Sequence, residues 1–290
     1  MDIAGVNSLV TGAASGIGKE TAMALARAGS HVMAADVDAK SLAEFAREAS
    51  QAGLDIQTMI VDVTDRAAYE ALALELKARG RLPGILVNNA GVGFLGSLFD
   101  TPTAAWDRLL RINVMGVVHG CQVFGPQMVA SGMDACIVNL SSAASAKPTP
   151  NMAAYAATKF AVEGLTDVLA MELNRSRVRV VSVHPGVIDT AIVHDTNGVS
   201  PKISARQLEG LQSYYAREGC HPYVVAKAIV DGIRKGQSKI FVGPSARISA
   251  LLRRFAPTSI KRRLTLKLSQ EIGFWHSEPN KSRLAIGRTK

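Results

Sequence analysis

The feature that most constrains the fold is the alternation of short apolar, β-branched runs with longer segments of helical periodicity. Because parallel strands need long crossover connections, this alternation predicts repeated βαβ units in one parallel sheet. The predicted strands are residues 7–11, 31–36, 55–61, 85–89, 136–141, 178–184 and 240–242. The predicted helices are residues 16–28, 39–52, 66–78, 103–130, 152–174 and 222–235. The sequence therefore predicts an α/β fold with one doubly wound parallel sheet of about seven strands, over residues 1–244.

One connection is much longer than the others. Residues 189–221 stand where a short loop is expected and are rich in Ser, Thr, Gly and Tyr. Long connections in compact domains are usually functional, and ligands of open α/β sheets bind beyond the carboxyl ends of the strands. We therefore expect residues 189–221 to form a lid over the substrate.

The charge of the chain is concentrated at its C-terminal end. The net charge is +9, and residues 245–290 hold eleven basic and two acidic residues, which leaves 22 of each sign in residues 1–244. A nucleic acid partner for the whole surface is therefore not expected.

Residues 245–290 are predicted to be a basic, amphipathic, helical extension. Its two apolar stripes are Ile248, Leu251, Leu252 and Phe255, then Ile260, Leu264 and Leu268 after Pro257. The stripes either pack on the lid or on a neighbouring subunit, or make peripheral contact with a membrane surface.

A glycine-rich turn follows the first predicted strand. Its sequence is TGAASGIG at residues 11–18, and a predicted helix begins within it. Glycines at 12, 16 and 18 allow a tight turn and a close backbone approach to a pyrophosphate, which the helix N-terminus attracts. The turn indicates a Rossmann-like dinucleotide site, although a generic strand-to-helix turn is the alternative.

Two acidic residues end the second and third predicted strands. Asp36 lies eighteen residues after Gly18, where a carboxylate binds the adenosine ribose and repels a 2′-phosphate. Neither Ser15 nor Val37 offers a basic side chain for that phosphate, so the sequence favours NAD over NADP. The alternative for Asp36 is an exposed turn or a helix cap. Asp62 either meets the adenine edge or caps the next helix.

The stretch from Ser142 to Lys159 holds the candidate catalytic groups. Tyr155 and Lys159 lie four residues apart on a predicted helix, so both side chains emerge on one face. An ammonium near a phenol is expected to lower the pKa of the phenol, which suits a general base for an alcohol proton. Ser142 follows the fifth strand at the same sheet edge, where its hydroxyl can hold the substrate oxygen.

With these motifs, the chain resembles the short-chain dehydrogenase/reductase family in its common single-domain form. The matching residues include NNAG at 88–91, Asn113, Pro185-Gly186 followed by Thr190, and thirteen residues from Ser142 to Tyr155. The resemblance covers about residues 1–244.

The resemblance implies roles for these positions. Tyr155 transfers the proton, Ser142 polarises the substrate oxygen, and Lys159 tunes Tyr155 and binds the nicotinamide ribose. Asn113 holds a water between Lys159 and solvent; a helix-bending or capping residue is its alternative. The implied cofactor-binding residues are Gly12, Ser15, Gly16, Ile17, Gly18, Asp36, Asp62, Val63, Asn89, Ala90, Gly91, Tyr155, Lys159, Pro185, Gly186, Val187 and Thr190.

The predicted function is hydride transfer between NAD and an apolar secondary alcohol or its ketone. The candidate pocket residues are mostly apolar: Ala143, Pro148, Met152, Val187, His194, Tyr214 and Tyr215. Lys147 and Lys202 are the basic candidates, and a solvated surface position is expected for each. An NAD-binding regulatory protein with little turnover is the alternative. Epimerisation or dehydration needs a larger C-terminal substrate domain than 46 residues provide.

The cysteines and the N-terminus bear on the compartment. Cys121, Cys136 and Cys220 are odd in number and far apart, with no metal-ligand spacing, so no metal site is expected. No apolar run reaches the length of a signal or spanning segment. These features predict a reducing, cytoplasmic location, with the extension as the one candidate for membrane association. The resemblance implies a homodimer or homotetramer.

Overall fold

A computed structural model describes residues 1–190, 198–244, 246, 251 and 255–275. Its seven strands form one parallel sheet in the order β3-β2-β1-β4-β5-β6-β7. The strands are β1 (Asn7–Thr11), β2 (His31–Asp36), β3 (Ile56–Ile60), β4 (Ile85–Asn88), β5 (Ala135–Leu140), β6 (Val178–Pro185) and β7 (Lys239–Val242). The chain reverses its direction of travel across the sheet between β1 and β4, so the predicted doubly wound, Rossmann-like fold is confirmed.

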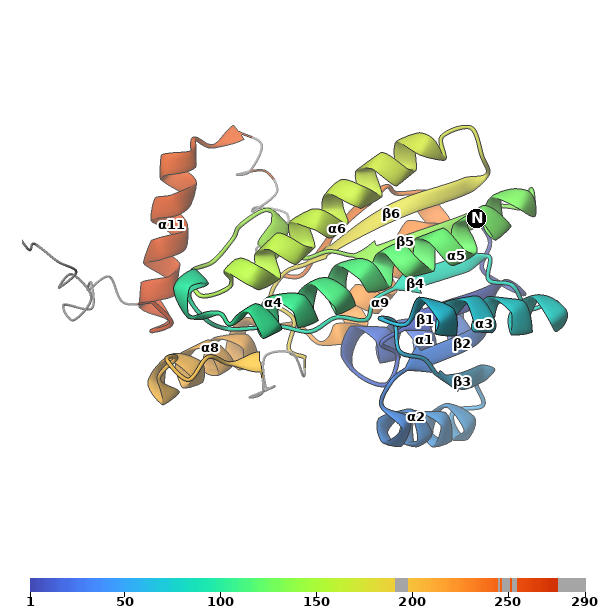
Figure 1. Ribbon diagram of the computed structural model, residues 1–290, viewed down its shortest axis with the longest axis horizontal. Helices are drawn as coiled ribbons and strands as arrows, with labels where there is room; N and C mark the ends of the chain where they lie inside the picture. The colour runs from blue at the N-terminus through green and yellow to red at the C-terminus, as the bar shows by residue number, and fades with distance from the viewer. Residues whose placement is uncertain (191–197, 245, 247–250, 252–254, 276–290) are drawn as a thin grey trace, which may run out of the picture.

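Helices cover both faces of this sheet (Figure 1). The main helices are α1 (Gly16–Arg27), α2 (Ala39–Gln51), α3 (Arg66–Ala78), α4 (Thr103–Leu109), α5 (Gly116–Ala130), α6 (Ala153–Glu172), α8 (Ala205–Glu218), α9 (Pro222–Lys235) and α11 (Thr258–Glu271). Short 3-10 turns lie at η1 (Leu98–Asp100) and η3 (Ala143–Ser145). The predicted helix over residues 103–130 is α4 and α5 joined by the π-helical segment η2 (Leu110–Met115).

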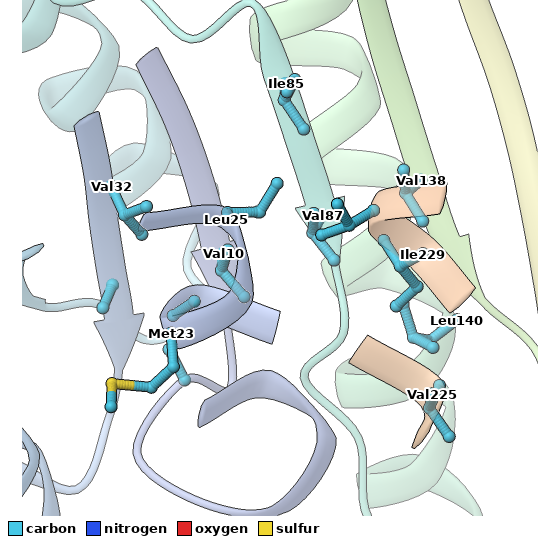
Figure 2. Packing of buried hydrophobic residues seen from close by; sticks show 14 of the residues in the cluster. Val10, Met23, Leu25, Val32, Ile85, Val87, Val138, Leu140, Val225 and Ile229 are labelled. Atoms are coloured by element: carbon cyan, nitrogen blue, oxygen red, sulfur yellow. The ribbon is translucent and has the colours of Figure 1, made fainter. Parts of the chain in front are cut away.

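The strands are buried on both faces because successive side chains point to opposite sides of the sheet. In β4, Ile85 and Val87 pack in one core with residues of α1 and α9, whereas Leu86 packs in a second core with residues of α3 and α5. Figure 2 shows the first core, where Leu25 and Ile229 meet the strand residues. The two helical layers therefore cover the faces of the sheet, and the site can form at the carboxyl ends of the strands.

The predicted lid contains a helix that the sequence analysis did not assign. Helix α8 begins at a capping box in which Ser204 accepts from the Gln207 amide and the Gln207 side chain accepts from the Ser204 amide. Both α8 and α11 lie at one end of the molecule, beyond the first turn of α6 (Figure 1). Among the described residues, no helix is long and apolar enough to cross a membrane.

The C-terminal extension packs on the lid, but through a different face than the sequence predicts. Thr265 and Ser269 are buried, whereas Ile260 and Leu264 of the predicted stripe are exposed and Leu268 is half-buried. Ile260 and Leu264 therefore do not pack on the lid, and their contact with a neighbouring subunit or a membrane surface stays a prediction. On the buried side of α11, the Ser269 hydroxyl donates to the Thr265 carbonyl. In the first predicted stripe Leu251 and Phe255 are exposed, while Ile248 and Leu252 lie outside the described residues.

Candidate active site

The glycine-rich turn joins β1 to α1 and is fastened to the end of β4. Gly12 has φ +64°, and a Cβ atom on Gly18 would lie 2.0 Å from the Gly12 carbonyl oxygen. Both positions therefore require glycine. The Asn89 side-chain amide donates to the Thr11 and Gly12 carbonyls at 2.9 and 3.1 Å. The tight turn that the sequence predicts is thus held by an amide from the neighbouring strand.

The first turn of α1 leaves its backbone N–H groups for a ligand. Ser15 is the N-cap but makes no side-chain capping bond, and no acidic residue lies in the first turn. Uncapped N–H groups and the helix dipole attract a phosphate. A cavity of about 320 Å³ lies at this turn.

The Asp36 carboxylate lies at the rim of this cavity and is not a helix cap. One oxygen accepts from the Ala14 amide at 2.9 Å and the other from the Asp38 amide at 3.1 Å. Asp38 caps α2, and Asp65 rather than Asp62 caps α3. Asp36 and Asp62 both line the cavity. The capping alternatives for Asp36 and Asp62 are therefore wrong.

The structure brings together the predicted cofactor residues, with one exception. The 320 Å³ cavity is lined by Gly12, Ser15, Gly16, Ile17, Asp36, Asp62, Val63, Asn89, Ala90, Gly91 and Thr190. An adjoining cavity of about 200 Å³ is lined by Tyr155, Lys159, Pro185, Gly186 and Val187, and shares Ile17, Asn89, Gly91 and Thr190 with the first. Gly18 lies beneath the turn and lines neither cavity. Sequence reasoning missed Val61, Val92, Arg108 and Ile112 because no motif marks them.

The candidate catalytic groups come from the end of β5 and the first turns of α6. The Ser141 hydroxyl donates to the Lys159 carbonyl at 2.9 Å, which fastens α6 to β5. The Ser142 hydroxyl oxygen accepts from the Ala144 amide, and the Ser142 side chain lies near enough to Tyr155 to influence the pKa of the phenol. The Lys159 ammonium lies 5.7 Å from the centroid of the Tyr155 ring and donates to the Leu140 carbonyl. The predicted shared face is confirmed.

Asn113 lies in the π-helical segment and is fully buried. Its carboxamide donates to the Val92 carbonyl and to Thr158, and accepts from the Val92 amide. A Cβ atom on Gly91 would lie 3.3 Å from the Asn113 Oδ1 and 3.5 Å from the Lys159 Nζ. The glycine therefore leaves room between Asn113 and Lys159. π-helical turns interrupt the regular backbone hydrogen bonds and often occur at functional sites.

Burial shifts the pKa values of both ionisable candidates. Desolvation lowers the pKa of Lys159 to about 8 and raises the pKa of Tyr155, while the polar side chain of the nearby Ser142 acts to lower the pKa of Tyr155. The lowering of the Tyr155 pKa that the sequence predicts is therefore not present. The physical reason is that burial disfavours charged forms. It disfavours the phenolate of Tyr155, and it also disfavours the protonated form of Lys159 that would stabilise the phenolate.

Burial of Lys159 predicts a stability cost at this site. Because its pKa falls from 10.5 to about 8, the folded protein binds this proton less tightly than the unfolded chain does. The resulting loss of stability is largest below pH 8, and it disappears as the pH rises towards 10.5. We expect Lys159→Met to raise the free energy of unfolding by about 2 kcal/mol at pH 7 and by less at pH 9. Urea unfolding at both pH values measures this, and an equal gain at both would contradict it.

The 200 Å³ cavity lies over Ser142 and Tyr155 and is the candidate substrate site. Of the predicted pocket residues, Ala143, Met152, Val187, Tyr214 and Tyr215 line it. Pro148 lies in a neighbouring groove, and His194 lies outside the described residues. Lys202 is exposed and forms an ion pair with Asp100 at 2.7 Å, as a surface lysine should. Lys147 departs from the expectation, because it is half-buried and lines the cavity.

Helix α11 forms a wall of this cavity, which sequence reasoning did not predict. Thr265, Leu268, Ser269 and Ile272 line it from the extension. The chain after α11 is anchored by Phe274, which is fully buried against Leu95 and Leu211. The Asn151 and Gln207 side-chain amides both donate to the Phe274 carbonyl. The extension, the lid and the loop before α6 thus form one packed unit beside Tyr155.

The Phe274 anchor can be tested by truncating its side chain. We expect Phe274→Ala to cost about 3 kcal/mol at this contact and to release α11, because a buried aromatic ring leaves a cavity. Limited proteolysis followed by mass spectrometry should then show faster cleavage within residues 255–275. Phe99→Ala is the matched control, since Phe99 is 89% exposed. Equal cleavage rates in the two variants would contradict the anchor.

The fold and the two adjoining cavities define a class of protein. A parallel doubly wound sheet with a glycine-rich turn, an acidic end to β2 and a Ser-Tyr-Lys group at the carboxyl edge is typical of Rossmann-like dinucleotide-binding proteins. The family model described as short chain dehydrogenase matches residues 7–199. The chain therefore belongs to the short-chain dehydrogenase family.

Similar proteins agree with this assignment. The chain is 36% identical over 263 residues to EphD of Mycobacterium tuberculosis, a protein described as an oxidoreductase. That match covers 89% of this chain but 44% of EphD, so the chain spans less than half of this relative.

Two similar crystal structures carry different dinucleotides. A short-chain dehydrogenase/reductase from Burkholderia phymatum in complex with NAD has a TM-score of 0.79 at 29% identity, over 96% of this chain and 99% of that chain. A metagenomic short-chain oxidoreductase in complex with NADP has a TM-score of 0.67 at 29% identity, over 83% and 98%. The family thus binds nicotinamide dinucleotides of both kinds.

Proposed function

We propose that this protein is an NAD-dependent dehydrogenase that interconverts an apolar secondary alcohol and its ketone. The observation that carries the proposal is the meeting of two cavities, one at the glycine-rich turn and one over Ser142 and Tyr155. A dinucleotide that fills the first can reach the reacting carbon in the second. When bound, NAD supplies the hydride acceptor of the oxidation.

The residues present fit such a cofactor. The uncapped turn of α1 would bind the pyrophosphate, Asp36 the adenosine ribose, and Asp62 and Val63 the adenine side. Asn89, Ala90 and Gly91 would line the adenosine side, as the family resemblance implies. Pro185, Gly186, Val187 and Thr190 would lie along the nicotinamide end. NAD is proposed over NADP because a carboxylate at Asp36 repels a 2′-phosphate.

Tyr155 is proposed as the group that takes the hydroxyl proton of the alcohol. Ser142 and Tyr155 line the same cavity, so a substrate oxygen bound between the two hydroxyls would meet both a donor and a base. Because burial raises the pKa of Tyr155, oxidation should speed up as the pH rises. Ketone reduction needs the protonated phenol and should show the opposite dependence.

Lys159 and Asn113 are proposed to move the proton away from Tyr155. Lys159 has its pKa lowered to about 8, which allows it to exchange a proton near neutral pH, and its ammonium can also bind a ribose hydroxyl. The Asn113 carboxamide is occupied by Val92 and Thr158. We therefore assign the binding of a linking water to the π-helical backbone around Asn113 rather than to its side chain.

The apolar lining of the second cavity supports the substrate class. Phe94, Leu95, Met152, Leu211 and Leu268 surround the space above Tyr155. A screen of secondary alcohols and ketones with NAD and with NADP, followed by nicotinamide absorbance, tests the proposal. Turnover of apolar members with NAD is expected. Tight NAD binding with no turnover across the panel would favour the regulatory alternative instead.

The remaining proposals concern the whole molecule. We propose that residues 1–244 form the catalytic domain, residues 189–221 the lid, and residues 245–290 an extension that helps to close the substrate site. Helix α11 supports this division because it lines the cavity, and because Ile272 and Phe274, which follow it, pack with Leu208 and Leu211 of α8. A homodimer or homotetramer is proposed from the family resemblance, and light scattering measures the assembly. A cytoplasmic location is proposed from the scattered, unpaired cysteines.

A further inference from the structure

The catalytic cavity adjoins a second, larger hollow under α11. The cavity over Tyr155 measures about 200 Å³, and a groove of about 860 Å³ shares Lys147, Thr149 and Thr265 with it. The groove is mostly apolar: Pro148, Pro150 and Phe160 line one side, and Leu264 and Leu266 of α11 line the other. A ligand too large for the catalytic cavity could therefore extend into the groove and contact its apolar surface.

The charges along this joint space have one sign. The basic residues that line the cavity or the groove are Lys147, Lys159, Lys261 and Arg262. Among the described residues, no Asp or Glu lines either space. A concave, largely apolar site with cations and without carboxylates attracts an anionic ligand.

Lys147 is the cation best placed to meet the anionic group of a substrate. Lys159 is engaged with Tyr155 and the Leu140 carbonyl, and Arg262 is exposed at the outer side of the groove. Lys147 lies at the wall shared by cavity and groove, and its amide donates to the Ala143 carbonyl at 2.8 Å. That bond ties its backbone to the turn that begins at Ser142.

The Lys147 ammonium is half-buried and has no hydrogen-bond or ion-pair partner in the described part of the chain. Desolvation lowers its pKa, and no acidic neighbour among the described residues offsets this cost. A half-buried cation without a counter-ion is stabilised by an anionic ligand, because charge-assisted hydrogen bonds are stronger than neutral ones.

We propose that Lys147 binds a carboxylate of the substrate, so that this enzyme acts on apolar secondary alcohols or ketones that carry an ionised acid group. The inference rests on the proposed oxidoreductase function and names the substrate class of that site. It replaces the surface position that the sequence predicts for Lys147 with a specificity-determining role.

The first test compares acids with their esters. The substrates are a series of methyl ketones ending in a carboxylate, with short to long spacers, each paired with its methyl ester. For the acids with the best spacer, Lys147→Met should lower kcat/KM about 10- to 100-fold, as expected for a lost charge-assisted bond. The values for the esters should not change. Equal losses for acids and esters, or no loss for any acid, would overturn the proposal.

Control variants separate charge from structure. Lys147→Arg keeps the cation and should keep the preference for acids. Lys202→Met removes a lysine that is paired with Asp100 at the surface and should leave both substrate sets unaffected. The proposal would be contradicted if Lys202→Met lost the preference for acids. It would also be contradicted if Lys147→Arg lost this preference as completely as Lys147→Met, because the positive charge at position 147 would then not matter.

A binding measurement tests whether Lys147 binds an anionic ligand, independently of any catalytic activity. Calorimetry with full-length protein saturated with NADH should show tighter binding of octanoate than of octanamide, and Lys147→Met should abolish this difference. If the native protein does not distinguish the two probes, the anionic site is refuted even where ketones are reduced. If no ketone is reduced but octanoate binds through Lys147, the proposed oxidoreductase function fails and the anion site stands.

Discussion

Tyr155→Phe is expected to lower kcat by about 10³-fold or more, because positioned acid–base groups typically contribute factors of about 10² to 10⁴. The substitution removes one hydroxyl from the cavity that Ser142 also lines and keeps the ring against which Lys159 lies. The dinucleotide cavity at the glycine-rich turn does not include Tyr155, so NAD binding should survive. Steady-state kinetics and cofactor fluorescence measure the two effects separately.

The matched control for this variant is Tyr214→Phe. Tyr214 also lines the substrate cavity, and it packs edge-to-face on Tyr215, but it makes no contact with Ser142 among the described interactions. Its loss of a hydroxyl should change substrate affinity more than kcat. Near-native turnover in Tyr155→Phe would remove this residue from proton transfer. Equal loss of kcat in both variants would point to a general disturbance of the pocket.

Asp36→Asn should weaken the discrimination between NAD and NADP by about 10- to 100-fold, because a like-charge contact with the 2′-phosphate costs several kcal/mol. The amide oxygen can still accept from the Ala14 backbone, so the glycine-rich turn should keep its geometry. The effect should appear as tighter NADP binding with little change in NAD binding. The ratio of kcat/KM for the two cofactors is the measurement.

Asp38→Asn controls for the loss of a negative charge in the same loop. Asp38 caps α2 through the Lys40 and Ser41 amides and does not line the dinucleotide cavity. Its substitution should leave the cofactor ratio unchanged. A native preference for NADP, or a shift of the same size in both variants, would contradict the role of Asp36.

The sequence predicted most of the sheet because each strand is marked by an apolar run of neighbouring residues. Strands β1 and β2 and helices α3 and α9 have the predicted bounds, and the other predicted strands differ by one residue at one or both ends. Periodicity does not depend on distant contacts, since each strand is buried on both faces. The face shared by Tyr155 and Lys159 follows from helical geometry for the same reason.

Local signals can also mislead or pass unnoticed. The capping box at Ser204 and Gln207 was readable but lies in a segment treated as an irregular lid. The leucine stripe of α11 suggested its buried face, yet the helix turns Thr265 and Ser269 inward and leaves Leu264 at the groove. An amphipathic pattern predicts which face of a helix is packed only where the burial of large apolar side chains contributes more than the close contact that small side chains allow.

By itself, the sequence determined the doubly wound sheet, the glycine-rich turn and the Ser142, Tyr155 and Lys159 group, because these depend on backbone geometry and short spacings. Only the tertiary structure placed α11 against the loop that carries Lys147, more than a hundred residues earlier in the chain. That contact depends on the packing of Phe274 against the lid, which no local spacing encodes. The part of the pocket formed by Ser142, Tyr155 and Lys159 therefore depends on short motifs, whereas the wall formed by α11 depends on long-range packing.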